Sequence, residues 1–514
     1  MLKSRPIRKV LLIFPPSTSL IFWEPTVTTP MGIAYLAASL RELGYEVVGL
    51  DTLAASPDQV VPIAEHVGRI GLSYPEIIAQ VEREKPDVVG LSCIFSNQWP
   101  AVKELAHRIK ALDRGILVAG GGAHPSFLAE RCLRESDLDF ILLGEADRSF
   151  PEALHRIQEG QSLADLDGIA FREAGQIRVN PQTSWIQNLD ELPFPAHDLF
   201  PPETYFRLAL PMGYHLRSNR ALPIVTSRGC PCHCTFCSST HHWGRTYRAR
   251  SPENVLREIE WLVSTFGVRE LKFQDDNLTA DRKRARQLFE GLTRFHPRLY
   301  WNTPNGIAIW TLDDELLRLM KQSGCYEITL AAESGDQEVL SNLIRKPLRL
   351  EKVEEVNRLA RNHGIFREAY FLIGFPGETR AQIEKTIRFS RRLKLDHCTI
   401  FIYNPLPGSE LYEECLRRGY ITEDSFFQAG NNYYGSILDT EEFTSVELER
   451  IIRREYLLNY LSIFRNPLVV LPRHYAFLRF RPNVLRFFWA RTMRAFRLLL
   501  RLRPTPAKTA TTSS

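Results

Sequence analysis

The first 150 residues alternate between short apolar runs and longer stretches with helical spacing. The runs are rich in β-branched residues and have the length of buried strands. They cover residues 10–14, 47–50, 88–92, 116–119 and 140–143, with helical patterns over 31–43 and 101–112. Alternation at this spacing is typical of a parallel sheet with helices on both faces. We therefore expect a doubly wound, Rossmann-like α/β domain over residues 1–150, with ligands at the carboxyl ends of its strands.

Residues 151–215 have a different pattern, and we interpret them as a linker. Gly, Pro and Asn recur between Asp165 and Tyr214, and the run Glu191-Leu-Pro-Phe-Pro195 cannot lie inside a helix. The stretch has room for a small β-hairpin.

A second series of strand and helix patterns fills residues 216–430. The strand-like runs cover residues 224–226, 270–273, 299–301, 326–330, 369–373 and 398–401. Helical patterns lie between them, among them 252–265, 312–322 and 380–393. Six such units predict a partial (β/α)6 barrel, whose functional residues lie on loops at the carboxyl ends of the strands.

The last segment, residues 431–514, is predicted to be a helical, basic extension. Eleven basic residues and no acidic residue lie between Tyr456 and Ser514. Between Val484 and Leu502 five arginines fall within one arc of roughly 140° on a helix, and apolar residues occupy much of the remainder. These are Arg486, Arg491, Arg494, Arg497 and Arg501. An amphipathic basic helix of this kind fits peripheral contact with an anionic membrane surface. The alternative is a helix packed on the barrel with a solvated charged face, and nucleic acid ranks last.

Composition indicates a soluble, multidomain protein of a reducing compartment. With 514 residues, 44% of them hydrophobic, it can bury two or three domain cores. No uncharged apolar stretch approaches the ~20 residues of a membrane span, and Pro15-Pro16 end the first apolar run, so we expect no signal peptide. Four of the nine cysteines fall within eight residues, which favours metal ligation over a disulfide framework. We therefore expect a cytoplasmic protein.

The crowded cysteines predict an iron–sulfur cluster. Cys230, Cys234 and Cys237 give the spacing Cys-x3-Cys-x2-Cys directly after a predicted strand. Three thiolates bind three irons of a [4Fe-4S] cubane and leave the fourth iron open to a small molecule. A structural zinc site and a redox cluster with a distant fourth ligand are the alternatives. Cys232 lies inside the loop, and we interpret it as a neighbouring thiol rather than a ligand.

The loop Arg228-Gly-Cys-Pro-Cys-His-Cys-Thr-Phe-Cys237 resembles the signature of radical S-adenosylmethionine enzymes, and further motifs of that family follow in order. They are Phe273-Gln-Asp-Asp-Asn277, Glu333-Ser-Gly335, Phe371-Leu-Ile-Gly-Phe-Pro-Gly-Glu378 and Pro405-Leu-Pro-Gly-Ser-Glu-Leu-Tyr412. The resemblance implies that the cluster cleaves S-adenosylmethionine to a 5'-deoxyadenosyl radical. It also implies cofactor-binding roles for Phe236 in the loop, Asp275 and Asp276 at the methionine amino group, Glu333 at the ribose, and Gly374 and Gly377 beside the adenine. Taken singly, the acidic residues have simpler interpretations as strand-end or helix caps.

Small residues end two predicted strands of the first domain. Ser92 ends one, and Gly121 and Gly122 end the next. Such residues open the crevice above a sheet to a bulky nucleotide tail. Their spacing resembles that of cobalamin-binding domains, and Gly144 matches the next loop of those domains loosely. No His precedes His66, so we expect cobalamin without a protein imidazole ligand to cobalt. The alternative is an α/β domain that has lost cofactor binding.

Together these resemblances predict a cobalamin-dependent radical enzyme. We expect transfer of a methyl group from methylcobalamin to an unactivated carbon or phosphorus of a small molecule, such as a lipid, isoprenoid or tetrapyrrole. The electrons would come from an external reductant of the flavodoxin or ferredoxin type. One alternative is an oxidative or ring-rearranging enzyme similar to the anaerobic porphyrin cyclases, and another is a non-catalytic cobalamin sensor. Methylthiotransferase activity on tRNA is disfavoured, because Cys93 and Cys132 are the only cysteines before the loop and form no second cluster motif.

Overall fold

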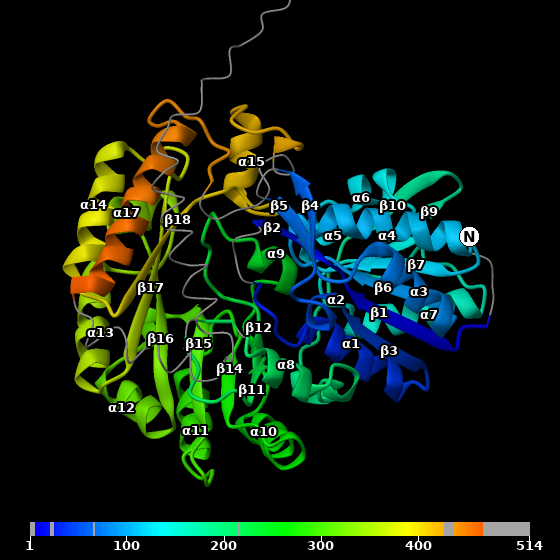
Figure 1. The fold of residues 1–514 in the computed structure, drawn as a ribbon, viewed down its shortest axis with the longest axis horizontal. Helices are drawn as coiled ribbons and strands as arrows, with labels where there is room; N and C mark the ends of the chain where they lie inside the picture. Colours follow the sequence, from blue (N-terminus) through cyan, green and yellow to red (C-terminus); the bar gives the residue numbers. More distant parts are fainter. Residues whose placement is uncertain are drawn as a thin grey trace, which may run out of the picture.

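The computed structural model describes residues 6–20, 25–64, 67–210, 212–213, 215–425 and 435–465. Within these residues the chain forms two α/β units that stand side by side, each built around its own sheet (Figure 1). The first unit is coloured blue to cyan and the second green to orange.

The N-terminal sheet has seven strands in the order β10-β9-β8-β7-β6-β1-β3. Its strands from β3 to β8 run parallel. This is the flavodoxin-like order of a doubly wound sheet, which confirms the predicted fold of this domain. The parallel strands are β1 (Lys9–Phe14), β3 (Glu46–Asp51), β6 (Val88–Ser92), β7 (Leu117–Gly121) and β8 (Phe140–Leu142).

Each face of this sheet has its own apolar core. Val10 and Leu12 of β1 pack into the core on the side of α1 and α7, while Leu11 and Ile13 pack with α3 and α4. Because both faces are buried, the strands are apolar throughout rather than alternating with polar residues. The helices are α1 (Met31–Glu42), α2 (Thr52–Ala55), α3 (Tyr74–Glu84), α4 (Trp99–Leu112), α5 (Ala123–Phe127), α6 (Ala129–Glu135) and α7 (Ala146–Gln158).

Two antiparallel additions extend this domain. β9 (Ile169–Glu173) pairs with β8 and with β10 (Gln176–Asn180), so the hairpin expected in the linker continues the N-terminal sheet. A second sheet, in the order β2-β5-β4, was not predicted. It contains β2 (Ser17–Leu20), β4 (Val60–Ala64) and β5 (Val67–Ile70). Beyond the hairpin, the turns η2 (Leu189–Glu191) and η3 (His197–Leu199) and helix α8 (Pro202–Leu208) lead to the second unit.

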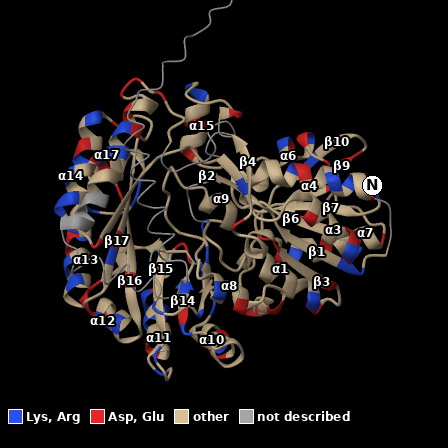
Figure 2. Ribbon diagram, in the orientation of Figure 1, with Lys and Arg blue, Asp and Glu red and all other residues tan. Residues whose placement is uncertain are grey.

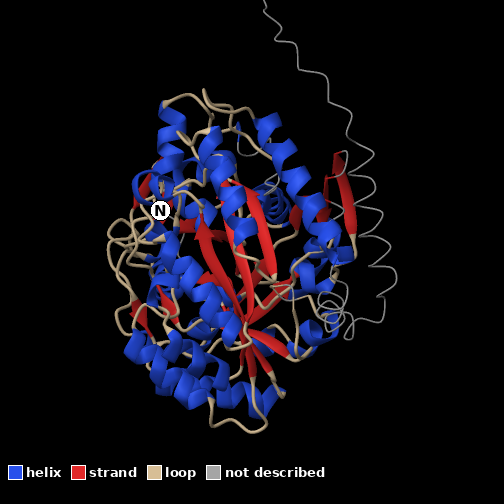
Figure 3. Cartoon of the chain, turned by 90° about the vertical axis from the view of Figure 1, so that its left-hand side faces the viewer, coloured by secondary structure: helices blue, strands red, loops and turns tan. Residues whose placement is uncertain are grey.

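The second unit is a partial (β/α)6 barrel, as the sequence predicts. Its six strands lie in the order β11-β14-β15-β16-β17-β18 and are all parallel. Figure 3 shows strands enclosed by helices. The strands are β11 (Ala221–Ile224), β14 (Glu270–Phe273), β15 (Tyr300–Ile307), β16 (Cys325–Glu333), β17 (Phe366–Ile373) and β18 (His397–Ile402). The helices are α9 (Ser239–Trp243), α10 (Pro252–Phe266), α11 (Arg282–Leu292), α12 (Asp314–Gln322), α13 (Leu350–Asn362), α14 (Arg380–Arg392) and α15 (Glu410–Arg417).

The first barrel strand ends earlier than the sequence indicated. β11 stops at Ile224, which pairs with Phe273, whereas the expected strand covered residues 224–226. The reason is that the backbone N–H and the hydroxyl of Thr226 both donate to the carboxylate of Asp275. These bonds replace ladder pairing and turn the chain toward the cysteine loop.

Beyond the barrel, helix α17 (Ser445–Arg465) packs against β18, and its Leu448 joins the barrel core. Basic and acidic residues are interspersed over the outer barrel helices (Figure 2). The predicted amphipathic helix of the tail lies outside the described residues. Within the residues that the structure describes, no helix is long and apolar enough to cross a membrane.

Candidate active site

The cysteine loop follows the short strand β12 (Ser227–Arg228), close to the carboxyl end of the first barrel strand. Cys230, Cys234 and Cys237 are free and partly exposed. Thr235 anchors the loop, because its N–H donates to the carbonyl of Ile344 at 3.1 Å and its hydroxyl to that of Leu343 at 2.9 Å. These two bonds fix the loop against the segment that follows β16.

The thiols differ in their surroundings. A hydrogen bond from Cys232 lowers the pKa of Cys230 to about 6, with help from the Asn277 amide, whose Nδ2 lies 3.8 Å from the Cys230 sulfur. Burial raises the pKa of Cys234 to about 11 and that of Cys237 to about 12. Thiols that bind a metal are deprotonated by it, so each of these groups is a competent ligand.

The donor set of the loop consists of thiols, which are the ligands of an iron–sulfur cluster. Among the described residues, no three His, Cys, Asp or Glu side chains converge on one metal position, as a tetrahedral zinc site would need. Each thiolate of a cubane binds a different iron, so a cluster does not require that convergence.

The two aspartates that follow β14 have different positions. Asp275 is buried and accepts hydrogen bonds from the hydroxyls of Thr226 at 2.7 Å and Ser227 at 2.5 Å, so it braces the start of the cysteine loop. Burial raises its pKa, and these hydrogen bonds oppose the increase. Asp276 is exposed and accepts from the hydroxyl of Ser239, two residues beyond Cys237. Asp276 therefore lies on the open side of the loop, while the role of either carboxylate toward a ligand stays a prediction.

Glu333 ends β16 in an unusual conformation. Its φ of 63° is in the left-handed region, which is rarely adopted by residues other than glycine and clusters at functional sites. Its Oε1 lies 2.9 Å from Nζ of Lys346, and both side chains are nearly buried. Sequence analysis missed Lys346, because an isolated lysine beyond a motif carries no signal. Between the two residues the chain forms a π-helical turn, η5 (Val339–Leu343), a rare conformation that is frequent at functional sites.

The Gly374 loop packs against the cysteine loop through aromatic rings. The ring centroids of Phe236 and Phe375 lie 5.8 Å apart. Gly374 has a φ of 88°, a conformation that favours glycine, and a Cβ there would lie 2.5 Å from the end of the Leu448 side chain of α17. Gly377, with φ of 84°, is exposed, and a Cβ there would meet only Leu343 at 3.6 Å. Of the two glycines, Gly377 is the one that leaves space for a ligand.

The residues predicted to admit cobalamin meet at one edge of the N-terminal sheet. Ser92 and Gly121 are register partners in the parallel pair β6 and β7. Gly122 has a φ of 105°, and Gly144 follows the neighbouring strand β8, where its N–H donates to the hydroxyl of Ser126. A Cβ on Gly121 would meet no atom within 3.8 Å, its nearest neighbour being Leu142 at 3.9 Å. At Gly121 this edge therefore forms an open cradle of the kind that a bulky ligand needs. Gly122 and Gly144 are closely packed, because a Cβ there would lie 2.6 Å from the carbonyl oxygen of Cys93 and 1.8 Å from Oε1 of Gln182.

This cradle adjoins the barrel. A Cβ on Gly144 would lie 3.0 Å from the carbonyl oxygen of His242, in the helix α9 that follows the cysteine loop. On the same side, the ring of Phe127 lies 6.3 Å from the ring of His242 and packs against the backbone of Gly408. The two predicted cofactor sites are thus neighbours across the domain interface.

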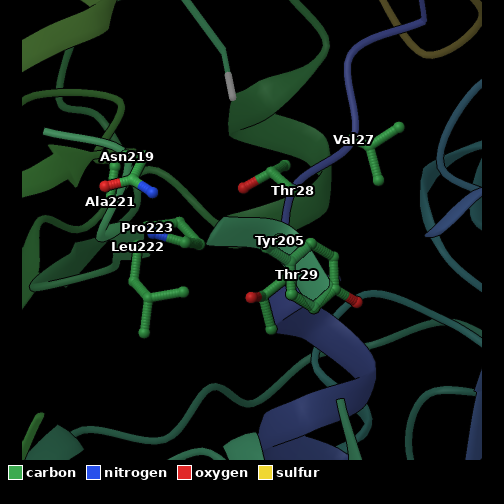
Figure 4. Close-up of a pocket in the computed structure, with 8 residues that line it drawn as sticks. All are labelled: Val27, Thr28, Thr29, Tyr205, Asn219, Ala221, Leu222 and Pro223. Atoms are coloured by element: carbon green, nitrogen blue, oxygen red, sulfur yellow. The ribbon is translucent and has the colours of Figure 1, made fainter. Parts of the chain in front are cut away.

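Two other cavities lie away from this interface edge. One is lined by Thr29, Tyr205 and the start of β11 (Figure 4). Its volume of about 10 Å³ suits one water molecule, and the buried hydroxyl of Thr29 has no protein partner. The other, of about 460 Å³, lies between α1, α7 and the η2 segment. Neither is lined by a residue that the sequence analysis predicts to bind a cofactor.

Comparisons with known proteins agree with this arrangement. Residues 25–154 match the B12 binding domain family, and residues 224–390 match the Radical SAM superfamily. The structure of the radical S-adenosylmethionine methyltransferase TsrM from Kitasatospora setae, which has cobalamin and a [4Fe-4S] cluster bound, superposes with a TM-score of 0.64. The superposition covers 80% of this chain and 75% of TsrM at 18% identity, so it supports the fold alone.

Two of the sequence relatives are a methyltransferase and a cyclase. The cytidylyl-2-hydroxyethylphosphonate methyltransferase of Streptomyces wedmorensis is 34% identical over 83% of this chain and 85% of its own. An anaerobic magnesium-protoporphyrin IX monomethyl ester cyclase of Rubrivivax gelatinosus is 28% identical over 75% of this chain and 66% of its own. Because the first similarity spans both domains, this chain belongs to the family of radical S-adenosylmethionine enzymes with a B12-binding domain, which includes methyltransferases and anaerobic cyclases.

Proposed function

We propose that this protein transfers a methyl group from cobalamin to an unactivated carbon or phosphorus of a small molecule, after hydrogen abstraction by a 5'-deoxyadenosyl radical. The observation that carries the proposal is the contact between the two predicted cofactor sites. A Cβ on Gly144 at the cradle would lie 3.0 Å from the carbonyl oxygen of His242 in α9, which directly follows the cysteine loop. Two cofactors held on either side of one interface can act on one substrate, and positioning of this kind is a large contribution to rate.

The residues of the chain divide into three tasks. Cys230, Cys234 and Cys237 would hold the cluster, which when bound supplies the electron that cleaves S-adenosylmethionine. Asp276, Glu333 and Gly377 would position S-adenosylmethionine beside the cluster. Phe236 would support this site, since its ring packs against that of Phe375 in the Gly374 loop. Ser92, Gly121, Gly122 and Gly144 would admit the nucleotide tail of cobalamin, without an imidazole from the protein on cobalt.

The substrate class is proposed from the relatives and not from the cavity. Relatives carry the names of a nucleotide-linked phosphonate, of tetrapyrroles and of a hopanoid. We propose a small molecule of one of these classes, with electrons from a flavodoxin- or ferredoxin-type reductant. We propose a cytoplasmic location, which suits an oxygen-sensitive cluster. We also propose peripheral contact with a membrane through the basic tail.

The test uses the full chain, purified anaerobically and reconstituted with iron, sulfide and hydroxocobalamin. It is incubated with trideuteromethyl-labelled S-adenosylmethionine, dithionite and methyl viologen. Cytidylyl-2-hydroxyethylphosphonate and magnesium protoporphyrin monomethyl ester are the first substrates. Each methyl transfer should consume two S-adenosylmethionine and two electrons. The other products are S-adenosylhomocysteine, methionine and 5'-deoxyadenosine, all measurable by mass spectrometry.

Each outcome distinguishes a different function. A labelled methyl group in a product supports methyl transfer. A cyclised or rearranged product without added methyl supports the cyclase alternative, which the similarity to the Rubrivivax enzyme favours as second candidate. Failure to form any 5'-deoxyadenosine under reduction, with cobalamin bound, would support a sensor instead.

A further inference from the structure

Two arginines and two carboxylates form a closed ionic network between the domains. Arg228 Nη1 lies 2.7 Å from Asp147 Oδ2 and 3.3 Å from Glu145 Oε1. Arg248 Nη1 lies 2.7 Å and 2.8 Å from the two oxygens of Glu145. We call Glu145, Asp147, Arg228 and Arg248 the interdomain ion network. It contains equal numbers of positive and negative groups, so its charges cancel.

The local structure of each domain presents these groups to the other. Arg228 and Arg248 are directly opposite each other in the two-stranded ladder of β12 and β13 (Arg248–Ala249). Glu145 precedes α7 and Asp147 is in its first turn, where the helix dipole favours carboxylates. The guanidinium of Arg228 also lies 5.2 Å from the ring of Trp243 and 5.5 Å from that of Tyr35.

Burial restricts the geometry that the ion pairs of this network can adopt. The side chains of Arg228, Asp147, Arg248 and Glu145 are 6%, 7%, 3% and 1% exposed. In such surroundings an ion pair is favourable only when its hydrogen bonds are well aligned, and removal of one partner leaves a buried charge without compensation. The domains therefore have little freedom to shift at this point without breaking these bonds.

The network joins the two predicted cofactor loops directly. Arg228 is two residues before Cys230, and Glu145 directly follows Gly144 of the cradle. We propose that the interdomain ion network is a positioning device that fixes the distance and orientation between the cluster and cobalamin. This inference rests on the proposed function, since it assumes that both cofactors are bound. In this proposal all four residues are positioning residues, which act through the loops that they hold.

The test measures geometry rather than turnover. In the reconstituted protein, reduced to the [4Fe-4S]+ and cob(II)alamin states, pulsed EPR gives the distribution of distances between the two spins. Asp147→Asn and Glu145→Gln remove one charge each with little change in size, and Asp147→Glu retains the charge. The matched control is Asp396→Asn, which breaks another well-buried Arg–Asp pair, with Arg367 at 2.9 Å, inside the barrel.

We expect a broader or shifted distance distribution in Asp147→Asn and Glu145→Gln, near-native values in Asp147→Glu, and no change in Asp396→Asn. The rate of amide hydrogen exchange should increase in both residues 144–150 and residues 227–249 of Asp147→Asn and Glu145→Gln, and in neither of the other variants. Iron and cobalamin content should match the unaltered protein. A distance distribution in Asp147→Asn and Glu145→Gln identical to that of the unaltered protein overturns the inference. If the unaltered protein binds no cobalamin, the proposed function fails first, and the two failures are thus distinguished.

Discussion

The ammonium of Lys346 lies 2.9 Å from the Glu333 carboxylate, beside the cysteine loop. Lys346 is close enough to Cys234 to oppose the increase that burial causes in the pKa of this thiol. The pair therefore brings a buried cation to the predicted meeting point of the cluster and S-adenosylmethionine. A cation there stabilises negative charge, which the cluster gains on reduction and which the carboxylate of S-adenosylmethionine carries.

Lys346→Met should impair the reductive step. We expect the rate of 5'-deoxyadenosine formation under dithionite to fall by roughly tenfold or more, which corresponds to about 1.4 kcal/mol. The cluster potential, measured by EPR redox titration, should become more negative. Loss of one partner of a nearly buried pair should also lower the free energy of unfolding, by about 3 kcal/mol.

Lys346→Arg is the matched control, because it keeps the positive charge. It should retain the cluster potential within experimental error and most of the rate. An unchanged potential and rate in Lys346→Met would show that this cation does not act on the cluster.

Single alanine substitutions should separate the three predicted ligands from Cys232. Cys230→Ala, Cys234→Ala and Cys237→Ala should each lose most of the about four irons that a reconstituted cubane contains. Cys232→Ala should keep its iron and the EPR signal of the reduced cluster. Cys230 and Cys232 are hydrogen-bonded neighbours, so either sulfur could reach the same iron. A cluster that survives Cys230→Ala but not Cys232→Ala would contradict this assignment.

Gly121→Leu should abolish cobalamin binding without loss of folding. The backbone of Gly121 is not left-handed, and a Cβ there would meet only Leu142, so the new side chain projects into the open cradle. We expect the cobalamin absorption of the purified protein to disappear while its iron content and unfolding midpoint persist. Gly32→Ala, in α1, is the control, because a Cβ there meets no atom within 4 Å. Retention of cobalamin in Gly121→Leu would place the cofactor elsewhere.

The fold could be predicted from the sequence because its strands are buried on both faces. The apolar runs of both domains match the strands closely, and helical spacing indicates the helices between them. The barrel strands β15 and β11 depart from their predicted bounds. β15 continues to Ile307, beyond the expected end at residue 301. β11 stops at Ile224 because of a side chain 49 residues from Thr226, since Asp275 takes the hydrogen bonds of Thr226. The β2-β5-β4 sheet was missed for a different reason: β4 is largely exposed, so its sequence has no buried face to give it a pattern.

The family could be predicted where chemistry depends on sequence spacing, and prediction stopped where the site depends on three-dimensional contacts. Family membership followed from the cysteine loop and the ordered motifs, and the comparisons confirm it. Lys346 could not be found in this way, because an isolated lysine beyond a motif carries no signal. The interdomain ion network could not be found either, because its charged residues come from different domains. Gly374 shows a related limit, since the motif around it does not reveal that it lies against Leu448 of α17.

The carboxyl group of Glu378 should make stability depend on pH. Burial raises its pKa to about 8, against 4.5 for the unburied group, although the N–H groups of Gly374 and Phe375 donate to its Oε2. Between these values the folded chain holds a proton that the unfolded chain releases. Stability should therefore fall as pH rises from about 5 to about 8, by at most about 4 kcal/mol. Glu378→Gln keeps an acceptor for both N–H groups and cannot ionise. As pH increases, the free energy of unfolding of this variant should therefore rise relative to that of the unaltered protein. Urea unfolding at pH 5, 6.5 and 8 measures this, and parallel curves for the two proteins would show that Glu378 titrates normally.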